Sequence, residues 1–136
     1  RDMRFVDCCA RAWHGSLQAA GMTLNDRDLV ETHDCFTMAE LMRYEAMGLT
    51  ERGRGAQAAR GGWTAKDGKL PVNVSGGLKA KGHPIGATGV SMHALAAMQV
   101  LGEAGDMQVS GASVAGVFNM GGAGVANYCS IIEAMR

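Results

Sequence analysis

The segment SGGLKAKGHPIGATG, residues Ser75–Gly89, places a histidine between a glycine and a proline and leads directly into an apolar stretch. Gly82 permits a tight backbone turn, while Pro84 fixes its own φ and drives His83 toward an extended conformation. The His83 ring is therefore expected to be held rigidly at the start of a helix, whose dipole favours a thiolate, an oxyanion or a phosphate. A histidine that merely caps the turn is an equally good interpretation.

The helix predicted over Ala87–Leu101 has almost no polar side. From Val90 onward its polar residues are Ser91, His93 and Gln99, which do not align on one face. A helix that is apolar all round is buried on both sides, whereas one sheet of about four strands covers only one side. We therefore expect a second layer from outside this chain, either a missing domain or a partner.

Hydrophobic periodicity predicts that helices and strands alternate along the rest of the chain. Thr37 is expected to be an N-cap, with Glu40 as its capping-box partner. The order of elements predicts one α/β domain over residues 1–136, with a mixed sheet that ends in an antiparallel pair and is flanked by helices (αβα). The predicted helices also include Met3–Ala20, Phe36–Met47 and part of Arg52–Gly62, and the predicted extended segments are Leu29–His33, Pro71–Val74, Ala112–Phe118 and Val125–Ile132.

Composition narrows the classes of function. The 13 basic and 13 acidic side chains cancel, so no strong field attracts nucleic acid or an anionic membrane. The apolar runs are too short and interrupted to span a bilayer, and no signal-peptide pattern opens the chain. The start at Arg1 without a methionine indicates a fragment or a processed chain. The four cysteines lack metal-ligand spacing, which favours a reduced, cytoplasmic setting.

The loop His33-Asp34-Cys35-Phe36 follows a predicted strand. A cysteine with two histidines from separate loops, here His33 and His83, suits acyl-transfer or thioester chemistry. The plainer alternatives are a buried apolar cysteine, a satisfied turn histidine and a capping carboxylate. Zinc bound by His33, Cys35 and His83 is a weaker alternative, because the spacing matches no metal signature.

The glycine-rich segment Asn119–Gly124 has two interpretations. Its backbone N–H groups could stabilise an oxyanion, or it could form a tight hairpin between the last two strands. The segment Gly86–Gly89 lacks the Lys-Ser/Thr ending of a Walker motif, so nucleotide hydrolysis is disfavoured. Lys79 and Lys81 could meet phosphates or could simply be solvated.

Together these three loops resemble the thiolase superfamily. Gly-His-Pro followed by Ile85–Gly89 is similar to that family's histidine loop, especially after Asn73–Gly77. His33–Phe36, followed by Glu40-Leu41 and Tyr44–Leu49, resembles the sterol-carrier-protein-type branch. The resemblance covers nearly the whole chain and implies a thiolase C-terminal domain, whose N-terminal domain is absent from this chain. It also implies a five-layered fold in which helices are sandwiched between two sheets, which accounts for the expected buried helix.

The resemblance implies a role for each loop. A nucleophilic cysteine of the N-terminal half takes the acyl group, and His83 activates it. Cys35 acts as the second acid/base, and His33 and Gly121 contribute to oxyanion holes. Ser75, Gly76 and Gly77 are implied to bind substrate. Asn119-Met120-Gly121 stands where most thiolases carry Cys-x-Gly, which agrees with Cys35 as the acid/base.

The implied activity is that of an acyl-CoA C-acyltransferase, which cleaves 3-oxoacyl-CoA or condenses acyl-CoA with acetyl-CoA in lipid metabolism such as fatty acid β-oxidation. Its substrates are coenzyme A thioesters, and no cofactor or metal is implied. The expected assembly is a cytoplasmic homodimer or homotetramer. This chain alone is expected to be inactive. Alternatives are a thiolase-like aldolase that acts on a 3-hydroxyacyl-CoA side chain, usually with a partner chain, and a non-catalytic scaffold or lipid carrier.

Overall fold

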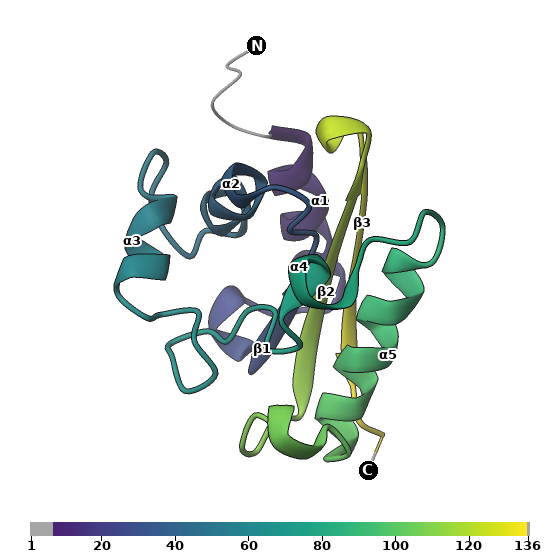
Figure 1. Ribbon diagram of the computed structural model, residues 1–136. Coiled ribbons are helices and arrows are strands. Elements are labelled where there is room, and N and C mark those ends of the chain that lie inside the picture. Colours follow the sequence, from purple (N-terminus) through teal and green to yellow (C-terminus); the bar gives the residue numbers. More distant parts are fainter. Residues whose placement is uncertain (1–6, 136) are drawn as a thin grey trace.

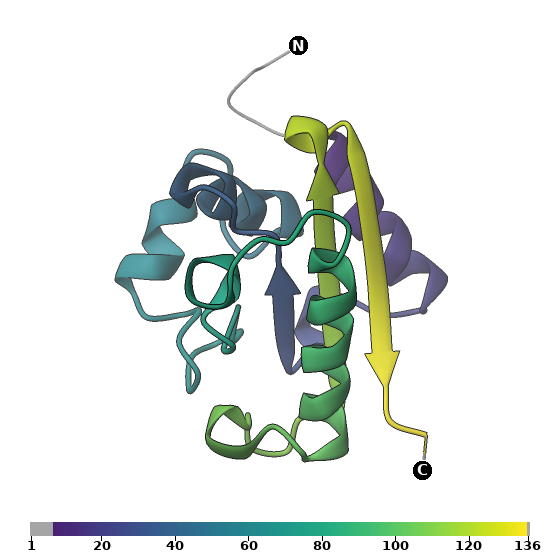
Figure 2. The same cartoon turned by 45° about the vertical axis from the view of Figure 1, so that its right-hand side comes forward.

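The structure is a computed structural model that describes residues 7–135. A three-stranded sheet lies between helices on both of its faces (Figures 1 and 2). The helices are α1 (Asp7–Ala19), α2 (Thr37–Met47), α3 (Gly55–Arg60), α4 (Gly77–Lys81) and α5 (Thr88–Leu101), and the strands are β1 (Leu29–Thr32), β2 (Val114–Gly121) and β3 (Ala126–Glu133). Three short 3-10 turns cover Leu24–Asp26, Gly105–Met107 and Gly122–Gly124. The predicted α/β class with a mixed sheet is confirmed.

The sheet has the order β1-β2-β3, with β1 parallel to β2 and β2 antiparallel to β3. A fourth extended segment touches its edge at one bridge, between Val72 and Val30. Pairing stops there because Asn73 takes a left-handed conformation, with φ of 51°, and turns its side-chain oxygen toward the Thr32 N–H at 2.7 Å. The expected sheet of about four strands is therefore three strands and a bridge.

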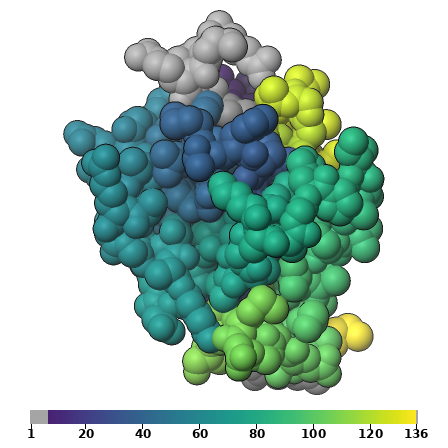
Figure 3. Space-filling model, in the orientation of Figure 1, coloured from purple at the N-terminus to yellow at the C-terminus, as the bar shows by residue number. Residues whose placement is uncertain are grey.

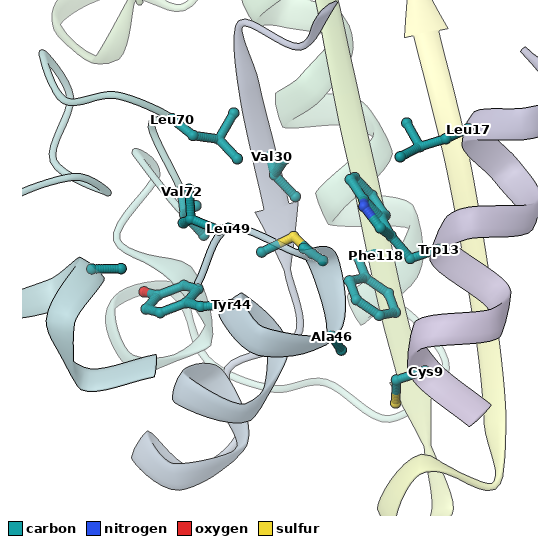
Figure 4. Packing of buried hydrophobic residues seen from close by; sticks show 12 residues of the cluster. Cys9, Trp13, Leu17, Val30, Tyr44, Ala46, Leu49, Leu70, Val72 and Phe118 are labelled. Carbon is teal, nitrogen blue, oxygen red and sulfur yellow. The ribbon is translucent and has the colours of Figure 1, made fainter. Parts of the chain in front are cut away.

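Side chains alternate across the strands and build two cores. Val30 and Phe118 face α1 and α2, whereas Leu29 and Val117 face α5. Figure 4 shows the first core, where Trp13 of α1 stacks on Phe118 with ring centroids 5.2 Å apart. The two cores fix the directions of β1 and β2, and hence the positions of the loops that follow these strands.

The helix α5 packs one side on the sheet and leaves its other side uncovered. Met92 and Ala96 are fully buried, whereas Val90 and Leu101 are 70% and 62% exposed. In Figure 2, α5 lies at the front of the sheet, with no further described element covering its outer side. The apolar outer side is the surface that the sequence predicts to be covered from outside this chain.

Some sequence-based expectations about the helices are wrong. Thr37 is not an N-cap, because Phe36 occupies that position in an extended conformation and no side chain caps the helix. The Glu40 carboxylate instead accepts a hydrogen bond from the Tyr44 hydroxyl at 2.8 Å and meets Lys79 at 3.2 Å. The helix α4 was not predicted. The predicted start at Met3 lies outside the described residues. Within the described residues, α1 covers Asp7–Ala19.

The loop before α2 and the helix α4 lie directly against each other on one face of the molecule, shown in blue and teal-green in Figure 3. The Lys79 contact with Glu40 joins the same two segments. Within residues 7–135, no helix is long and apolar enough to cross a membrane.

Candidate functional site

His33 directly follows β1 at the carboxyl end of the sheet. Its backbone N–H donates to the Phe118 carbonyl at 3.1 Å, which extends the pairing of β1 with β2 by one residue. The ring is buried, and its Nδ1 lies 2.8 Å from Asn119 Oδ1. The strand pairing therefore sets both the backbone and the ring of this histidine.

The hydrogen bonds of Asn119 define which nitrogen of His33 carries the proton. The Met120 backbone N–H donates to the same Asn119 Oδ1 at 2.9 Å, so this atom is the amide oxygen. Nδ1 of His33 must then be the donor, and Nε2 of the neutral ring is an acceptor. Burial lowers the pKa of His33, the nearby charges of Arg43 and His83 lower it further, and the Asn119 bond opposes them. The neutral form is therefore favoured.

His83 lies in the loop between α4 and α5, five residues before Thr88 rather than at the start of the helix. Gly82, with φ of 88°, turns the chain out of α4. The His83 Nδ1 lies 2.8 Å from the Thr88 Oγ1, and that hydroxyl donates its own proton to the Pro84 carbonyl at 2.9 Å. Nδ1 must then donate, so Nε2 of His83 carries a lone pair, as a general base requires.

The structure brings the two predicted histidines together. Their rings meet edge to face, with centroids 4.7 Å apart and planes at 85°. His33 is buried, whereas His83 is exposed. The two loops, 50 positions apart in the sequence, therefore form one site with a protected and an open imidazole.

Cys35 lies beside this site, half-buried and with a free thiol. In the described part of the chain, no hydrogen bond or ion pair involves this thiol. Residues 7–135 also contain no group of three histidine, cysteine or acidic side chains arranged to hold a metal ion, so the zinc interpretation gains no support. The role of Cys35 as an acid/base stays a prediction.

The Asp34 side chain binds the start of α4, as a capping carboxylate does. Its Oδ1 accepts the Leu78 backbone N–H at 2.8 Å, and its Oδ2 lies 3.3 Å from the Lys79 ammonium. Gly77 is required here, because its φ is 62° and a Cβ would collide with the Asp34 carboxylate. Asp34 therefore joins the His33 loop to α4.

The segment predicted to bind substrate, Ser75–Gly77, makes internal contacts. The Ser75 hydroxyl donates to Glu31 Oε2 at 2.8 Å and accepts the Gly77 N–H at 3.3 Å. Gly76 takes the left-handed conformation before α4. Substrate binding by these residues stays a prediction, and the contacts present here hold α4 against β1.

The glycine-rich segment forms the tight connection between the last two strands. β2 ends at Gly121, which pairs with Ala126, and Gly122–Gly124 make a 3-10 turn in which Ala123 has φ of 52°. Asn119 of the same segment holds His33. The hairpin interpretation is confirmed, and Gly121 as an oxyanion donor stays a prediction.

Sequence reasoning missed two side chains that orient the histidines, Asn119 and Thr88. A lone amide at the end of a predicted strand was the available signal for Asn119. Thr88, five residues after His83, was available as a hydroxyl at the start of the following helix. Neither spacing indicates by itself which histidine nitrogen each side chain meets.

The domain has a mixed sheet with helices on both faces, and the two histidine loops meet at the carboxyl edge of this sheet. Domains of this α/β type carry ligand sites at that edge. The model of the family described as "Thiolase C-terminal domain-like" matches residues 1–134. The chain belongs to this family.

Relatives support the assignment and show its extent. The chain is 44% identical over 124 residues to an acetyl-CoA acetyltransferase of Methanothermobacter thermautotrophicus. This match covers 91% of the chain and 32% of that protein. It is 48% identical over 104 residues to human sterol carrier protein 2, and this match covers 76% of the chain and 19% of that protein. The chain thus spans about a third or less of the length of these relatives.

A solved structure shows the same fold. The chain superposes on a chain of an Ltp2-ChsH2(DUF35) aldolase with a TM-score of 0.80 and 23% sequence identity, covering 93% of this chain and 31% of that one. At this identity the likeness shows the fold alone.

Proposed function

We propose that this chain is the C-terminal catalytic half of an acyl-CoA C-acyltransferase of the thiolase type, acting on 3-oxoacyl-CoA or in the reverse condensation. The observation that carries the proposal is the lone pair on Nε2 of His83. The Thr88 hydroxyl, which has donated its proton to a carbonyl, sets this tautomer. Such a nitrogen accepts a proton from a thiol.

Each step of the proposed reaction has a group to carry it. In condensation, His83 takes the proton of a cysteine of the N-terminal half, the thiolate attacks the acyl-CoA carbonyl, and coenzyme A leaves as a thiol with that proton. In cleavage, the same thiolate attacks the 3-oxo carbon, the carbon–carbon bond breaks to release acetyl-CoA, and coenzyme A then takes the acyl group from the cysteine. Cys35 moves the proton of the substrate α-carbon when the carbon–carbon bond breaks or forms. His33, neutral and an acceptor at Nε2, acts on the oxyanion through a bound water rather than by direct donation, while Gly121 offers its N–H.

The exposed apolar surface supports docking of an N-terminal half. Val90 and Leu101 of α5 and Tyr128 of β3 are each more than 60% exposed. Near the histidines, Ile85 is fully exposed and Phe36 is 74% exposed. Apolar patches of this kind mark interfaces in proteins that are otherwise charged at the surface. We further propose a cytoplasmic homodimer or homotetramer with coenzyme A thioesters as the substrates.

The test compares two substrates on the full-length protein that contains this chain. We expect CoA-dependent cleavage of a 3-oxoacyl-CoA and no cleavage of a 3-hydroxyacyl-CoA side chain, while this chain alone turns over neither. Cleavage of the 3-hydroxyacyl-CoA alone would establish the aldolase alternative. Binding of either thioester without turnover would favour a carrier or scaffold, and activity of this chain alone would contradict the division of labour between two halves.

A further inference from the structure

A buried ion pair joins the two histidine loops. The Glu31 carboxylate on β1 lies 3.5 Å from the Lys81 ammonium at the end of α4. The Glu31 side chain is 2% exposed and the Lys81 side chain 20%. Each partner stands two residues before a histidine, Glu31 before His33 and Lys81 before His83. The contact therefore joins the two segments that lead into the histidine loops.

The Lys81 ammonium depends on this one carboxylate. Its Nζ is buried, and within the described residues Glu31 is the carboxylate that it contacts. Glu31 is better satisfied, because its Oε2 also accepts the Ser75 hydroxyl at 2.8 Å. A buried charge that loses its partner is strongly unfavourable, so the position of Lys81 is coupled to that of β1.

The chain after Lys81 transmits this position to His83. Gly82 follows with φ of 88°, and His83 is tied on its far side to Thr88 at the start of α5. A second contact, between Asp34 and Lys79 at 3.3 Å, joins the same two segments. In the sequence, Glu31 and Asp34 flank His33, and their partners Lys81 and Lys79 precede His83.

Stability alone is a poor explanation for such a pair. Replacing a buried ion pair by apolar side chains of similar size is often neutral or stabilising, whereas ionic pairs can fix one packing register. A register-fixing role matches the location of Glu31 and Lys81, between two loops whose histidines must meet.

We propose that Glu31 and Lys81 are a positioning pair that holds the His83 ring against the His33 ring. Neither residue touches the substrate. The kinetic consequence rests on the proposed thiolase function, because it is measured as a loss of that activity. The geometric consequence does not, because it concerns the contact between the two rings alone.

The test uses the full-length protein with protonated histidines in a deuterated background. We expect a nuclear Overhauser effect between the ring protons of His33 and His83, whose centroids are 4.7 Å apart. Lys81→Met should abolish this signal and lower kcat by about 100-fold, the order of effect expected for misplacement by about 1 Å, with little change in KM. Lys81→Arg should retain both. Lys66→Met is the matched control, since Lys66 is an exposed lysine that binds the Asp106 carbonyl.

If Lys81→Met does not fold, the double variant Glu31→Gln/Lys81→Met leaves no unpaired buried charge and still removes the ion pair. We expect it to fold and to lose the ring contact. Retention of the ring contact in either variant would overturn the proposal. If the wild-type protein shows no thiolase activity, the proposed function fails, yet the ring contact and its dependence on Lys81 still decide whether this pair positions His83.

Discussion

At the scale of single residues, two hydrogen bonds decide what the histidines can do. Asn119 and Thr88 each accept a hydrogen bond from a ring Nδ1, which leaves both Nε2 atoms as acceptors. The two rings differ in exposure, since His33 is buried and His83 is open to solvent. In the proposed mechanism, the exposed His83 is the base and the buried His33 is its neutral neighbour.

Cys35→Ala tests the division between the two cysteines of the proposed mechanism. In the full-length protein, this substitution should block carbon–carbon cleavage, because no group is left to move the α-carbon proton. The acyl-enzyme should still form from an acyl-CoA and be visible as an added mass on the intact protein. Cys8→Ala is the control, since Cys8 is an exposed cysteine of α1. Equal loss of both steps in Cys35→Ala would contradict the acid/base role.

The buried His33 predicts a pH dependence. Burial lowers the pKa of His33 below its usual value of about 6.5. The unfolded state then binds the proton more tightly than the folded state does. The contribution of this group to stability is complete above about pH 6.5 and is lost as the pH falls through the folded pKa.

An NMR titration of the ring protons, assigned with His33→Gln, measures this value. We expect a midpoint below 6.5, and we expect His33→Gln to flatten the fall in stability over the same pH range. A midpoint at or above 6.5 would show that the ring is not held in the neutral form.

The identity of the two key histidines could be predicted from sequence, but their orientation could not. Gly-His-Pro and His-Asp-Cys-Phe are local patterns, so resemblance singled out His83 and His33 directly. Asn119 reaches His33 only because β2 pairs in parallel with β1, a contact between residues 86 positions apart. Long-range pairing of this kind leaves no signal in the local sequence.

At the scale of elements, the close approach of α1 to β2 depends on a glycine. A Cβ on Gly116 would lie 2.6 Å from the Trp13 ring, and Trp13 is fully buried against Phe118. The helix α1 therefore packs closely on the strand that carries Asn119. Hydrophobic periodicity predicted the helix itself, whereas the small residue opposite the tryptophan was visible only in the structure.

Gly116→Ala should destabilise the folded state by about 1–3 kcal/mol, the usual effect of overpacking a core. Gly15→Ala is the matched control, because Gly15 lies within α1 and a Cβ there meets nothing within 4 Å. This control should be stabilising by about 0.5–1 kcal/mol through its higher helix propensity. Urea denaturation monitored by tryptophan fluorescence measures both. Equal effects of the two substitutions would show that Trp13 does not need the space.

The element missed from the sequence was α4. Its five residues, Gly77–Lys81, begin with a glycine and contain too few apolar positions to show a period. The helix forms because Asp34 binds its first turn and because Glu31 holds Lys81 at its end. Tertiary contacts, rather than helix propensity, therefore account for it.

At the scale of the whole molecule, the uncovered side of α5 is the main departure from a self-contained domain. Val90 is 70% and Leu101 62% exposed on a helix whose opposite side is fully buried. The sequence predicted a helix apolar all round, and this is what the structure presents. The chain alone does not identify what would cover this side of the helix.

This chain on its own is expected to associate through that surface. Light scattering at micromolar concentration should report a mass above the 14.2 kDa of one chain. Val90→Lys with Leu101→Glu should shift the mass toward a monomer, because charges on the patch oppose its burial. The control is Arg11→Ala with Gln18→Ala, at exposed positions of α1. A monodisperse wild-type monomer would contradict the role of the α5 surface.

The central claim is that His83 is the base for a thiol supplied by the rest of the protein. The most direct test is the rate of CoA-dependent 3-oxoacyl-CoA cleavage by the full-length protein carrying His83→Gln, compared with His14→Gln at an exposed histidine of α1. Loss of a general base lowers rates by about 100- to 10,000-fold. The account predicts a loss of this size for His83→Gln and an unchanged rate for His14→Gln, and a His83→Gln protein that cleaves as fast as the wild type would contradict it.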